Sequence, residues 1–107
     1  MQPGSPNQFV PAPPPLFLDS GGRRYAINVP RFINGRERGA CHLVLADSNV
    51  SRQHAAVELA NGQFFMVDLG SRNGVGYNGH RVHRKQIVEG DRFEIGGHAI
   101  SFTFHNP

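Results

Sequence analysis

The sequence of 107 residues has little cysteine and lysine, one threonine and no tryptophan, and it contains no long apolar run. Because Cys41 is the only cysteine, neither a disulfide within the chain nor a multi-cysteine zinc site can form. No stretch approaches the roughly 18 apolar residues that span a bilayer, and the first 20 residues lack the charged start and apolar run of a signal peptide. We therefore expect a soluble, cytoplasmic protein with no membrane partner.

The length and charge of the chain narrow its function further. A chain of 107 residues has room for one small domain, which excludes a large enzyme with separate cofactor and substrate domains. Its 13 glycines and 8 prolines predict many short elements joined by turns. The net charge of +3 is carried by arginine, with Lys85 as the only lysine. Arginine favours bidentate contacts to phosphate or carboxylate, so the composition indicates an anionic partner.

Proline divides the chain into two parts. Residues 1–15 hold six of the eight prolines and no charged side chain, so they are predicted to be a disordered tail or linker. The segment Pro11 to Pro15 could also dock on an aromatic groove of a partner, which is the less favoured interpretation. The folded domain is predicted to span residues 16–105.

Apolar residues in this domain alternate, as they do in half-buried strands, and no helical periodicity of useful length is present. Turn-forming pairs punctuate the strands: Asn-Gly occurs four times and Gly-Gly twice, and residues 60–63 are the firmest hairpin. This pattern predicts an all-β, antiparallel sandwich or barrel. The predicted inner faces are Tyr25, Ile27 and Val29; Ala55, Val57 and Leu59; Phe65, Val67 and Leu69; and Ile100, Phe102 and Phe104. Shorter strands are expected at 16–19, 32–33, 43–45, 81–82 and 92–95.

Unusual polar residues lie in three of the turns, where binding residues are common. These turns are Asn34-Gly35-Arg36, the segment 50–54 (Val-Ser-Arg-Gln-His) and the segment 68–74 (Asp-Leu-Gly-Ser-Arg-Asn-Gly). A second Asn-Gly at 78–79 and Gly-Asp-x-x-x-Ile-Gly at 90–96 follow. Each motif is weak alone, but five in this order resemble the forkhead-associated (FHA) domain, from about Leu16 to Phe104.

The resemblance implies a β-sandwich of about eleven strands, of the FHA/SMAD type, whose apical loops bind a phosphothreonine peptide. A phosphate ester carries nearly two negative charges and three acceptor oxygens, so it needs several converging donors. By resemblance, Arg36 chelates the phosphate and the Ser51 hydroxyl donates to it. Arg52 and Arg72 hold positions where the family often adds a phosphate donor, and Asn73 resembles the residue whose amide holds the peptide main chain.

Four further residues are expected to support these loops structurally. His54 resembles the histidine that orders the Ser51 loop from beneath, and Gly35 and Gly74 are expected to permit the backbone turns that aim their neighbours. Asn78 belongs to the second Asn-Gly turn of the motif order.

The sequence departs from the family pattern at two places. Cys41-His42 stands where many members have aspartate, and Val75-Gly76 replaces a threonine and a larger residue. Neither departure removes a phosphate donor, so they bear on packing and peptide selectivity. In the family, the residue three after the phosphothreonine is read by the loops near Asn49 and Gly96-Gly97. The arginines at 52, 72 and 81 suggest an acidic neighbour in the ligand.

Other classes of function fit the sequence less well. Nucleic-acid binding is suggested by the sequence pI near 9.8 and by the basic run 80–85, but most aromatic residues alternate into expected core positions. A phosphate-transferring enzyme would need a P-loop, a nucleophile elbow or a metal cluster, and none is present in the sequence. We therefore expect no catalysis and no nucleic-acid partner.

Metal and acid–base sites are also disfavoured. His80, His83, His98, His105 and Cys41 do not have the spacing of a recognisable metal site, so neither a metal nor a cofactor is expected. Asp91 and Glu94 lie in a stretch typical of a turn entering a strand, which argues against paired catalytic carboxylates.

The ligand is expected in trans. Thr103 is the only threonine and lies in the last predicted strand, so the chain offers no phosphothreonine in its tail. The partner would be a phosphothreonine protein, either a serine/threonine kinase or a kinase substrate. The alternative is a degenerate FHA fold that binds a protein without phosphate.

Overall fold

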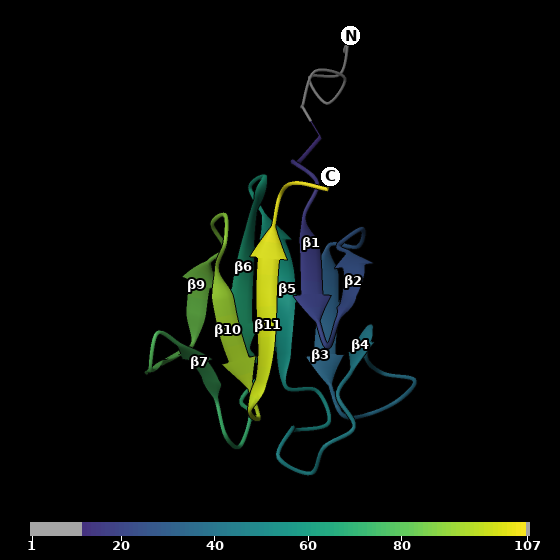
Figure 1. Cartoon of the computed structure of the whole chain (residues 1–107), viewed down its shortest axis with the longest axis vertical. Helices are drawn as coiled ribbons and strands as arrows, with labels where there is room; N and C mark the ends of the chain where they lie inside the picture. Colours follow the sequence, from purple (N-terminus) through teal and green to yellow (C-terminus); the bar gives the residue numbers. More distant parts are fainter. Residues whose placement is uncertain (1–11, 107) are drawn as a thin grey trace, which may run out of the picture.

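The computed structural model describes residues 12–106 as a sandwich of two β-sheets (Figure 1). The six-stranded sheet has the order β2-β1-β11-β10-β7-β8, and the five-stranded sheet has the order β4-β3-β5-β6-β9. The predicted β-sandwich of about eleven strands is confirmed, with one parallel pair, β3 and β4, among otherwise antiparallel neighbours. The strands are β1 Phe17–Ser20, β2 Arg23–Ala26, β3 Arg31–Gly35, β4 Leu43–Val44, β5 Ala55–Ala60, β6 Gln63–Asp68, β7 Val75–Tyr77, β8 His80–Val82, β9 Arg84–Gln86, β10 Arg92–Ile95 and β11 His98–Thr103.

Tight turns fix the register of the neighbouring strands. In the β5–β6 hairpin, Ala60 pairs with Gln63, and Asn61 and Gly62 have φ of 54° and 77°. Such left-handed φ values at both central residues match the twist of the strands. The predicted hairpin at 60–63 is therefore confirmed, and it pairs Val57 with Met66.

The predicted inner face of β6 is wrong. Phe64 and Met66 are buried in the core, whereas Phe65 and Val67 are only half-buried on the other face, and Leu69 lies beyond the strand. Both faces of β6 are rich in apolar residues, so alternation alone selects neither. The hairpin register decides, because it places Met66 opposite the buried Val57.

Two smaller predictions also need correction. The strand predicted through Tyr25, Ile27 and Val29 ends at Ala26 in the structure, although Ile27 is buried and its amide bonds to the Leu16 carbonyl at 2.8 Å. Asn34-Gly35 forms no tight turn, because both residues lie in β3 and neither has a positive φ.

The core lies between the sheets and consists mainly of aliphatic and phenylalanine side chains. Phe93 and Phe102 of the six-stranded sheet pack edge to face, with ring centroids 5.8 Å apart. Phe32, Val57 and Met66 of the five-stranded sheet face them, and each is at most 4% exposed. This burial holds the strands rigidly, so the loops at their ends have a fixed base.

The two ends of the sandwich differ in what they carry (Figure 1). At the lower end lie the loops 36–42, 45–54 and 69–74 and the turn 96–97, whereas the chain leaves the sandwich at the upper end. Most of the predicted tail, residues 1–11, lies outside the described residues. Within residues 12–106, no helix is long and apolar enough to span a membrane.

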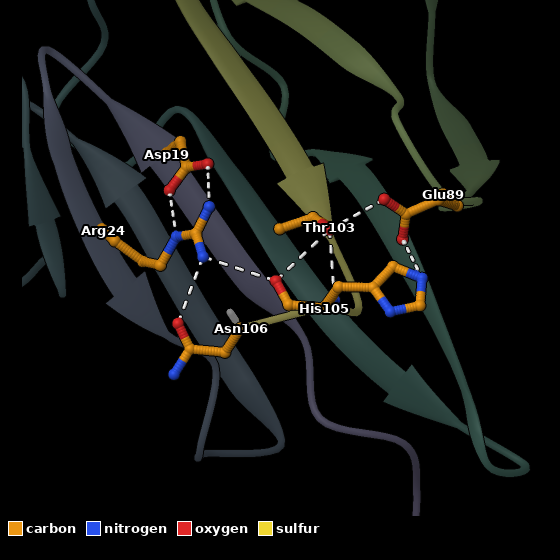
Figure 2. A network of polar contacts seen from close by, with 6 residues as sticks. All are labelled: Asp19, Arg24, Glu89, Thr103, His105 and Asn106. Carbon is orange, nitrogen blue, oxygen red and sulfur yellow. Dashed lines mark hydrogen bonds and ion pairs between the residues drawn. The ribbon is translucent and has the colours of Figure 1, made fainter.

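A polar network ties the C-terminal segment to the upper end of the sandwich (Figure 2). Arg24 makes a bidentate contact with Asp19 at 2.7 and 2.8 Å and also bonds to the Asn106 side chain at 3.1 Å. The Thr103 hydroxyl donates to Glu89 at 2.7 Å. This network, called here the terminal network, consists of Asp19, Arg24, Glu89, Thr103, His105 and Asn106.

Candidate functional site

Arg36 lies directly after β3, at the end of the sandwich that carries the loops 36–42, 45–54 and 69–74, called here the loop end. Its amide bonds to the Ser51 carbonyl at 3.0 Å, and its Nε donates to the Val50 carbonyl at 2.9 Å. The side chain is exposed, and its two Nη groups have no hydrogen-bond partner among residues 12–106. The loop therefore fixes the guanidinium in place and leaves its two terminal nitrogens for an anion.

Ser51 joins two of the loops through its hydroxyl. Its Oγ accepts a hydrogen bond from the Arg72 amide at 3.0 Å. Because the hydroxyl oxygen accepts that bond, its hydrogen is left to donate to a third group. Ser51 is half-buried, so this donor stays partly accessible, and the Arg36 amide bonds to the Ser51 carbonyl, which keeps the two residues close together.

Arg52 and Arg72 flank Ser51 on the two loops. Both side chains are exposed, and neither donates a side-chain hydrogen bond within the described part of the chain. Together with Arg36 they put an exposed arginine on each of the three loops 36–42, 45–54 and 69–74. An anion bound here would lie in a positive potential that acts over about 8 Å at physiological salt.

His54 lies beneath these loops and is fully buried. The Ser51 amide donates to its Nδ1 at 3.0 Å, so the ring proton lies on Nε2, which donates to the Gly74 carbonyl at 2.7 Å. One neutral imidazole thus ties the Ser51 loop to the loop 69–74. This is the place where the sequence predicted a supporting histidine.

The sequence led us to expect that Gly35 permits a backbone turn, but the structure requires glycine there for another reason. Its φ is not positive, but a Cβ here would collide with the Arg52 carbonyl oxygen and lie 2.9 Å from Cys41 Sγ. Close packing of the loop against β3, and not a turn, excludes a side chain. Gly74 has a φ of 80° as expected, and a Cβ there would also collide with the Arg81 side chain.

The side-chain amide of Asn73 makes a hydrogen bond within the protein through its nitrogen only. Its Nδ2 donates to the Asn49 carbonyl at 2.8 Å, which joins the loop 69–74 to the loop 45–54. The side chain is exposed, and Oδ1 has no partner among residues 12–106. The Oδ1 atom is therefore placed to accept a hydrogen bond from a ligand main chain. Asn78 lies farther away, with φ of 50° in the turn between β7 and β8.

The residues that brace the loop 69–74 were not predicted from the sequence. Asp68 accepts from the Ser71 amide at 3.0 Å, and the Ser71 hydroxyl accepts from the Gly74 amide at 2.9 Å. Arg81 donates to the Ser71 carbonyl at 3.1 Å. Arg81 was expected to face a ligand, but it is turned toward this loop. An Asp-x-x-Ser spacing ahead of Asn-Gly is the signal that could have revealed the brace.

A second brace joins the loop 45–54 to β11. Asp47 accepts from the Asn49 amide at 2.9 Å and lies 2.9 Å from His98 Nε2. These hydrogen bonds, first from the Asn49 amide and then from His98, lower the pKa of Asp47. The carboxylate therefore stays ionised and fixes the loop that carries Asn49.

The basic run 80–85 does not form one continuous surface. Arg81 lies in the six-stranded sheet and bonds to Ser71, whereas Arg84 lies in the five-stranded sheet, 3.8 Å from the centre of the Phe65 ring. Lys85 forms an ion pair with Asp91 at 2.7 Å. Each of these three cations contacts another group of the protein, and they lie in two different sheets. They therefore do not form the continuous basic surface that is typical of nucleic-acid binding.

The candidate metal ligands are also dispersed. His98 faces Asp47, His105 lies 3.8 Å from Glu89, and the Cys41 thiol donates to the Arg52 carbonyl at 3.1 Å. Burial raises the pKa of Cys41, so the thiol form dominates. In the part of the chain that the structure describes, no three histidine, cysteine or acidic residues are grouped as metal ligands.

Asp91 has a structural role at the start of β10. It is 5% exposed and accepts from Tyr77 Oη at 2.8 Å, Lys85 Nζ at 2.7 Å and the Val88 amide at 2.9 Å. Burial acts to raise the pKa of Asp91, but these three donors outweigh it and lower the pKa. Glu94 lies separately, exposed on β10.

Comparison with known proteins identifies the fold family. A family model described as the FHA domain matches residues 32–96, which is more than half of the chain. The chain belongs to the FHA domain family. As an FHA domain it is a binding module and not an enzyme, which agrees with the prediction from the sequence.

Relatives of this FHA domain include bacterial regulators. The glycogen accumulation regulator GarA of Mycolicibacterium smegmatis is 34% identical over 83 residues, which cover 78% of this chain and 52% of GarA. The oxoglutarate dehydrogenase inhibitor of Corynebacterium glutamicum is 31% identical over 78% of this chain and 57% of its own length. The chain thus spans little more than half the length of these two relatives.

Solved structures give the same fold. A structure from a study of phosphothreonine-dependent FHA domain interactions has a TM-score of 0.78 and 27% identity, over 87% of this chain and 99% of that one. EmbR of Mycobacterium tuberculosis, solved in complex with a low affinity phosphopeptide, has a TM-score of 0.80 and 27% identity, over 87% of this chain and 25% of EmbR.

Proposed function

We propose that this FHA domain binds phosphothreonine peptides at the surface formed by Arg36, Ser51, Arg52, Arg72 and Asn73. The observation that carries the proposal is that unpartnered donors lie on three loops that hydrogen bonds join to one another. Arg36 is held by its Nε and offers two Nη groups, and Ser51 offers a hydroxyl hydrogen. A phosphate dianion with three acceptor oxygens matches this set of donors.

The second half of the proposed site would hold the peptide main chain. An extended peptide presents an amide and a carbonyl at each residue, which a side-chain amide can bind. Asn73 is fixed by its bond to Asn49 and exposes Oδ1 beside the Ser51 and Arg72 pair. Phosphate and main chain would therefore be bound side by side, with threonine as the phosphorylated residue by analogy with the related structure studied for phosphothreonine dependence.

The partner is proposed to be a separate phosphorylated protein, either a serine/threonine kinase or a kinase substrate in the cytoplasm. Thr103, the only threonine in the sequence, lies in β11, and its hydroxyl is bonded to Glu89. It lies in the terminal network, at the end of the sandwich opposite to the proposed site (Figures 1 and 2). The folded unit is proposed to be residues 16–105, with the preceding residues as a linker.

Fluorescence polarisation with a degenerate phosphothreonine peptide pool tests the proposal, with phosphoserine and unphosphorylated pools as references. We expect saturable binding to the phosphothreonine pool alone. The Arg36→Ala variant should weaken this binding at least about 30-fold. The matched control is Arg38→Ala, because Arg38 is an exposed arginine two residues away that makes no side-chain hydrogen bond within residues 12–106.

Two results would contradict the proposal. Equal binding of all three pools would show that phosphate is not recognised, and it would favour the alternative of a phosphate-independent interaction domain. Equal losses in Arg36→Ala and Arg38→Ala would show that only the overall charge of the loops matters and that Arg36 has no specific role.

A further inference from the structure

A groove runs from the proposed phosphopeptide site onto the outer face of the six-stranded sheet. Its volume is about 440 Å³, and its lining includes four glycines and one charged residue, Glu94. It begins at Asn73, which the proposed function assigns to the peptide main chain. The lining residues are Asn49, Asn73, Gly74, Gly76, Glu94, Gly96 and Gly97.

The glycines keep the groove open. Gly76 of β7 pairs with Glu94 of β10, and a Cβ on Gly76 would lie 3.6 Å from Glu94 Cβ and 4.0 Å from Glu94 Oε1. The resemblance to the family led us to expect a larger residue at this position. Because glycine is present instead, the Glu94 carboxylate is left uncovered toward Gly76, and a ligand side chain can reach it.

The walls of the groove are held in fixed positions. Asn73 donates to the Asn49 carbonyl at 2.8 Å, which closes one end. On the other side, a Cβ on Gly96 would lie 2.7 Å from Val50 Cγ2 and 2.9 Å from the Asn49 carbonyl oxygen, so the β10–β11 turn packs directly on the loop 45–54. The groove therefore exists before any ligand binds, which lowers the entropic cost of binding.

Glu94 has no counter-ion within the protein. Among residues 12–106 it takes part in no ion pair and no side-chain hydrogen bond. Gly76 of β7 pairs with Glu94 on one side and with Arg81 of β8 on the other. Arg81 donates to the Ser71 carbonyl and not to Glu94. Arg92 lines the adjoining groove toward His80, which Arg81 and Glu94 also line, but neither arginine forms an ion pair with Glu94 among residues 12–106. A single carboxylate thus faces a groove whose other lining groups are uncharged.

From this arrangement we infer that Glu94 selects phosphopeptides with a lysine or arginine near the phosphothreonine. This basic residue would lie in the part of the peptide that passes over Asn73 into the groove. The inference rests on the proposed function and adds a substrate class to it. A long basic side chain can pass between the glycines and bring its charge to Glu94, whereas an acidic side chain would be repelled. The sequence suggested an acidic neighbour from three arginines, but Arg81 donates to the Ser71 carbonyl and is not among the residues that line this groove.

Peptides of defined sequence test this inference on the 107-residue chain. The probes are phosphothreonine peptides in which lysine, glutamine or glutamate is placed in turn at each flanking position. Fluorescence polarisation gives the ratio of the glutamine-peptide Kd to the lysine-peptide Kd at each position. For the unchanged chain we expect lysine to bind about three- to tenfold more tightly than glutamine at one position, the range of a partly shielded ion pair.

Variants at Glu94 make the test specific. Glu94→Gln should bring the lysine-to-glutamine ratio at that position to about one, and Glu94→Lys should reverse the preference toward glutamate. The matched control is Glu58→Gln, which removes the same charge from the five-stranded sheet and should leave the lysine preference as it is. Both Glu94 changes are on an exposed position, and circular dichroism verifies that the variants are folded.

The outcomes separate the inference from the proposed function. If lysine and glutamine peptides bind within twofold of one another at every position, or if Glu94→Gln keeps the lysine preference, the inference is overturned although phosphopeptide binding stands. If the phosphorylated glutamine peptides do not bind at all, the proposed function fails and the inference fails with it.

Discussion

The loop end of this FHA domain and the terminal network at its opposite end both contain arginine and hydroxyl groups. The two ends differ in how far these groups are hydrogen-bonded within the protein. In the terminal network, Arg24 is bonded to Asp19 and Asn106, and the Thr103 hydroxyl is bonded to Glu89 (Figure 2). At the loop end, Arg36 uses only its Nε, and no acidic group among residues 12–106 accepts from it.

This difference separates arginines that stabilise the fold from arginines that can bind a ligand. Hydrogen bonding to Asp19 raises the pKa of Arg24, and the same contact lowers the pKa of Asp19. The charges of Asp19 and Arg24 therefore compensate each other within the protein. At the loop end, backbone carbonyls hold Arg36 without neutralising it, so its charge remains available to an anion.

The largest expected effect is on binding, from Arg36→Ala compared with Arg24→Ala. Loss of the guanidinium leaves the bound phosphate without its main charged partner, so we expect about 2–5 kcal/mol of binding free energy to be lost, at least about 30-fold in Kd. Arg24→Ala should not change the Kd. Titration of both variants with one phosphothreonine peptide measures the contrast, and survival of affinity within twofold in Arg36→Ala would disprove its role.

His54 should have the largest effect on stability. Its removal leaves the Ser51 amide and the Gly74 carbonyl without partners in a buried place and also creates a cavity. We expect His54→Ala to lower the free energy of unfolding by about 2–4 kcal/mol in urea denaturation. The control, His83→Ala, removes an exposed imidazole. Similar midpoints for the two variants would show that His54 does not brace the loops.

The ionisation of Asp91 should make the stability of the fold depend on pH. Its pKa is lowered in the folded chain, so the ionised carboxylate stabilises the fold above about pH 4, and this contribution is lost as the pH falls through the folded pKa. Asp91→Asn should therefore cost about 1–3 kcal/mol at pH 7 and less in acid. Urea denaturation at several pH values measures both, with Glu37→Gln as the control, because it removes one negative charge from an exposed position. A loss that is constant down to pH 2.5 would contradict this account.

Peptide binding should depend on pH through the ligand. Below about pH 6 the phosphate ester takes up its second proton and loses one charge, which weakens its attraction to Arg36. We expect affinity to decline gradually between pH 7 and pH 5, by about tenfold or less. Arg36→Ala should show a flatter profile. A flat profile in the unchanged chain would indicate that the dianion is not the form that binds.

The smallest effect is expected in the terminal network. Asp19 and Arg24 are partly exposed, so solvent screens their ion pair, and Asp19→Asn should change the unfolding midpoint only slightly. Its phosphopeptide Kd should equal that of the unchanged chain. A change in Kd would mean that the two ends of the sandwich are coupled, which no contact among residues 12–106 predicts.

Local patterns predicted most of the fold and misled where two signals competed. The Asn61-Gly62 turn and the Val57 face of β5 were both visible in the sequence, and together they fix Phe64 and Met66 as the inner face of β6. Alternation alone fits the Phe65 and Val67 face of β6 equally well, because that face is also apolar. Asn34-Gly35 is typical of a turn by composition, whereas pairing with β4 and β5 keeps it in a strand.

The candidate site was predictable as a set of residues but not as a set of contacts. The motifs named Arg36, Ser51 and Asn73, and the structure brings their loops together through contacts between distant segments. No local signal showed that Arg81 turns to Ser71 or that Asp47 meets His98, because these partners are 10 and 51 residues apart. For the same reason, the open groove at Glu94 emerged only from the pairing of β7 with β10.

Phosphothreonine binding at the loop end is tested most directly by a map of amide chemical shifts by NMR during titration with a phosphothreonine peptide. We expect shifts at Arg36, Ser51, Arg72 and Asn73, none at Glu89 or Thr103, and none anywhere with the unphosphorylated peptide. Shifts centred on the terminal network, or equal shifts with both peptides, would contradict the assignment of phosphothreonine binding to the loop end.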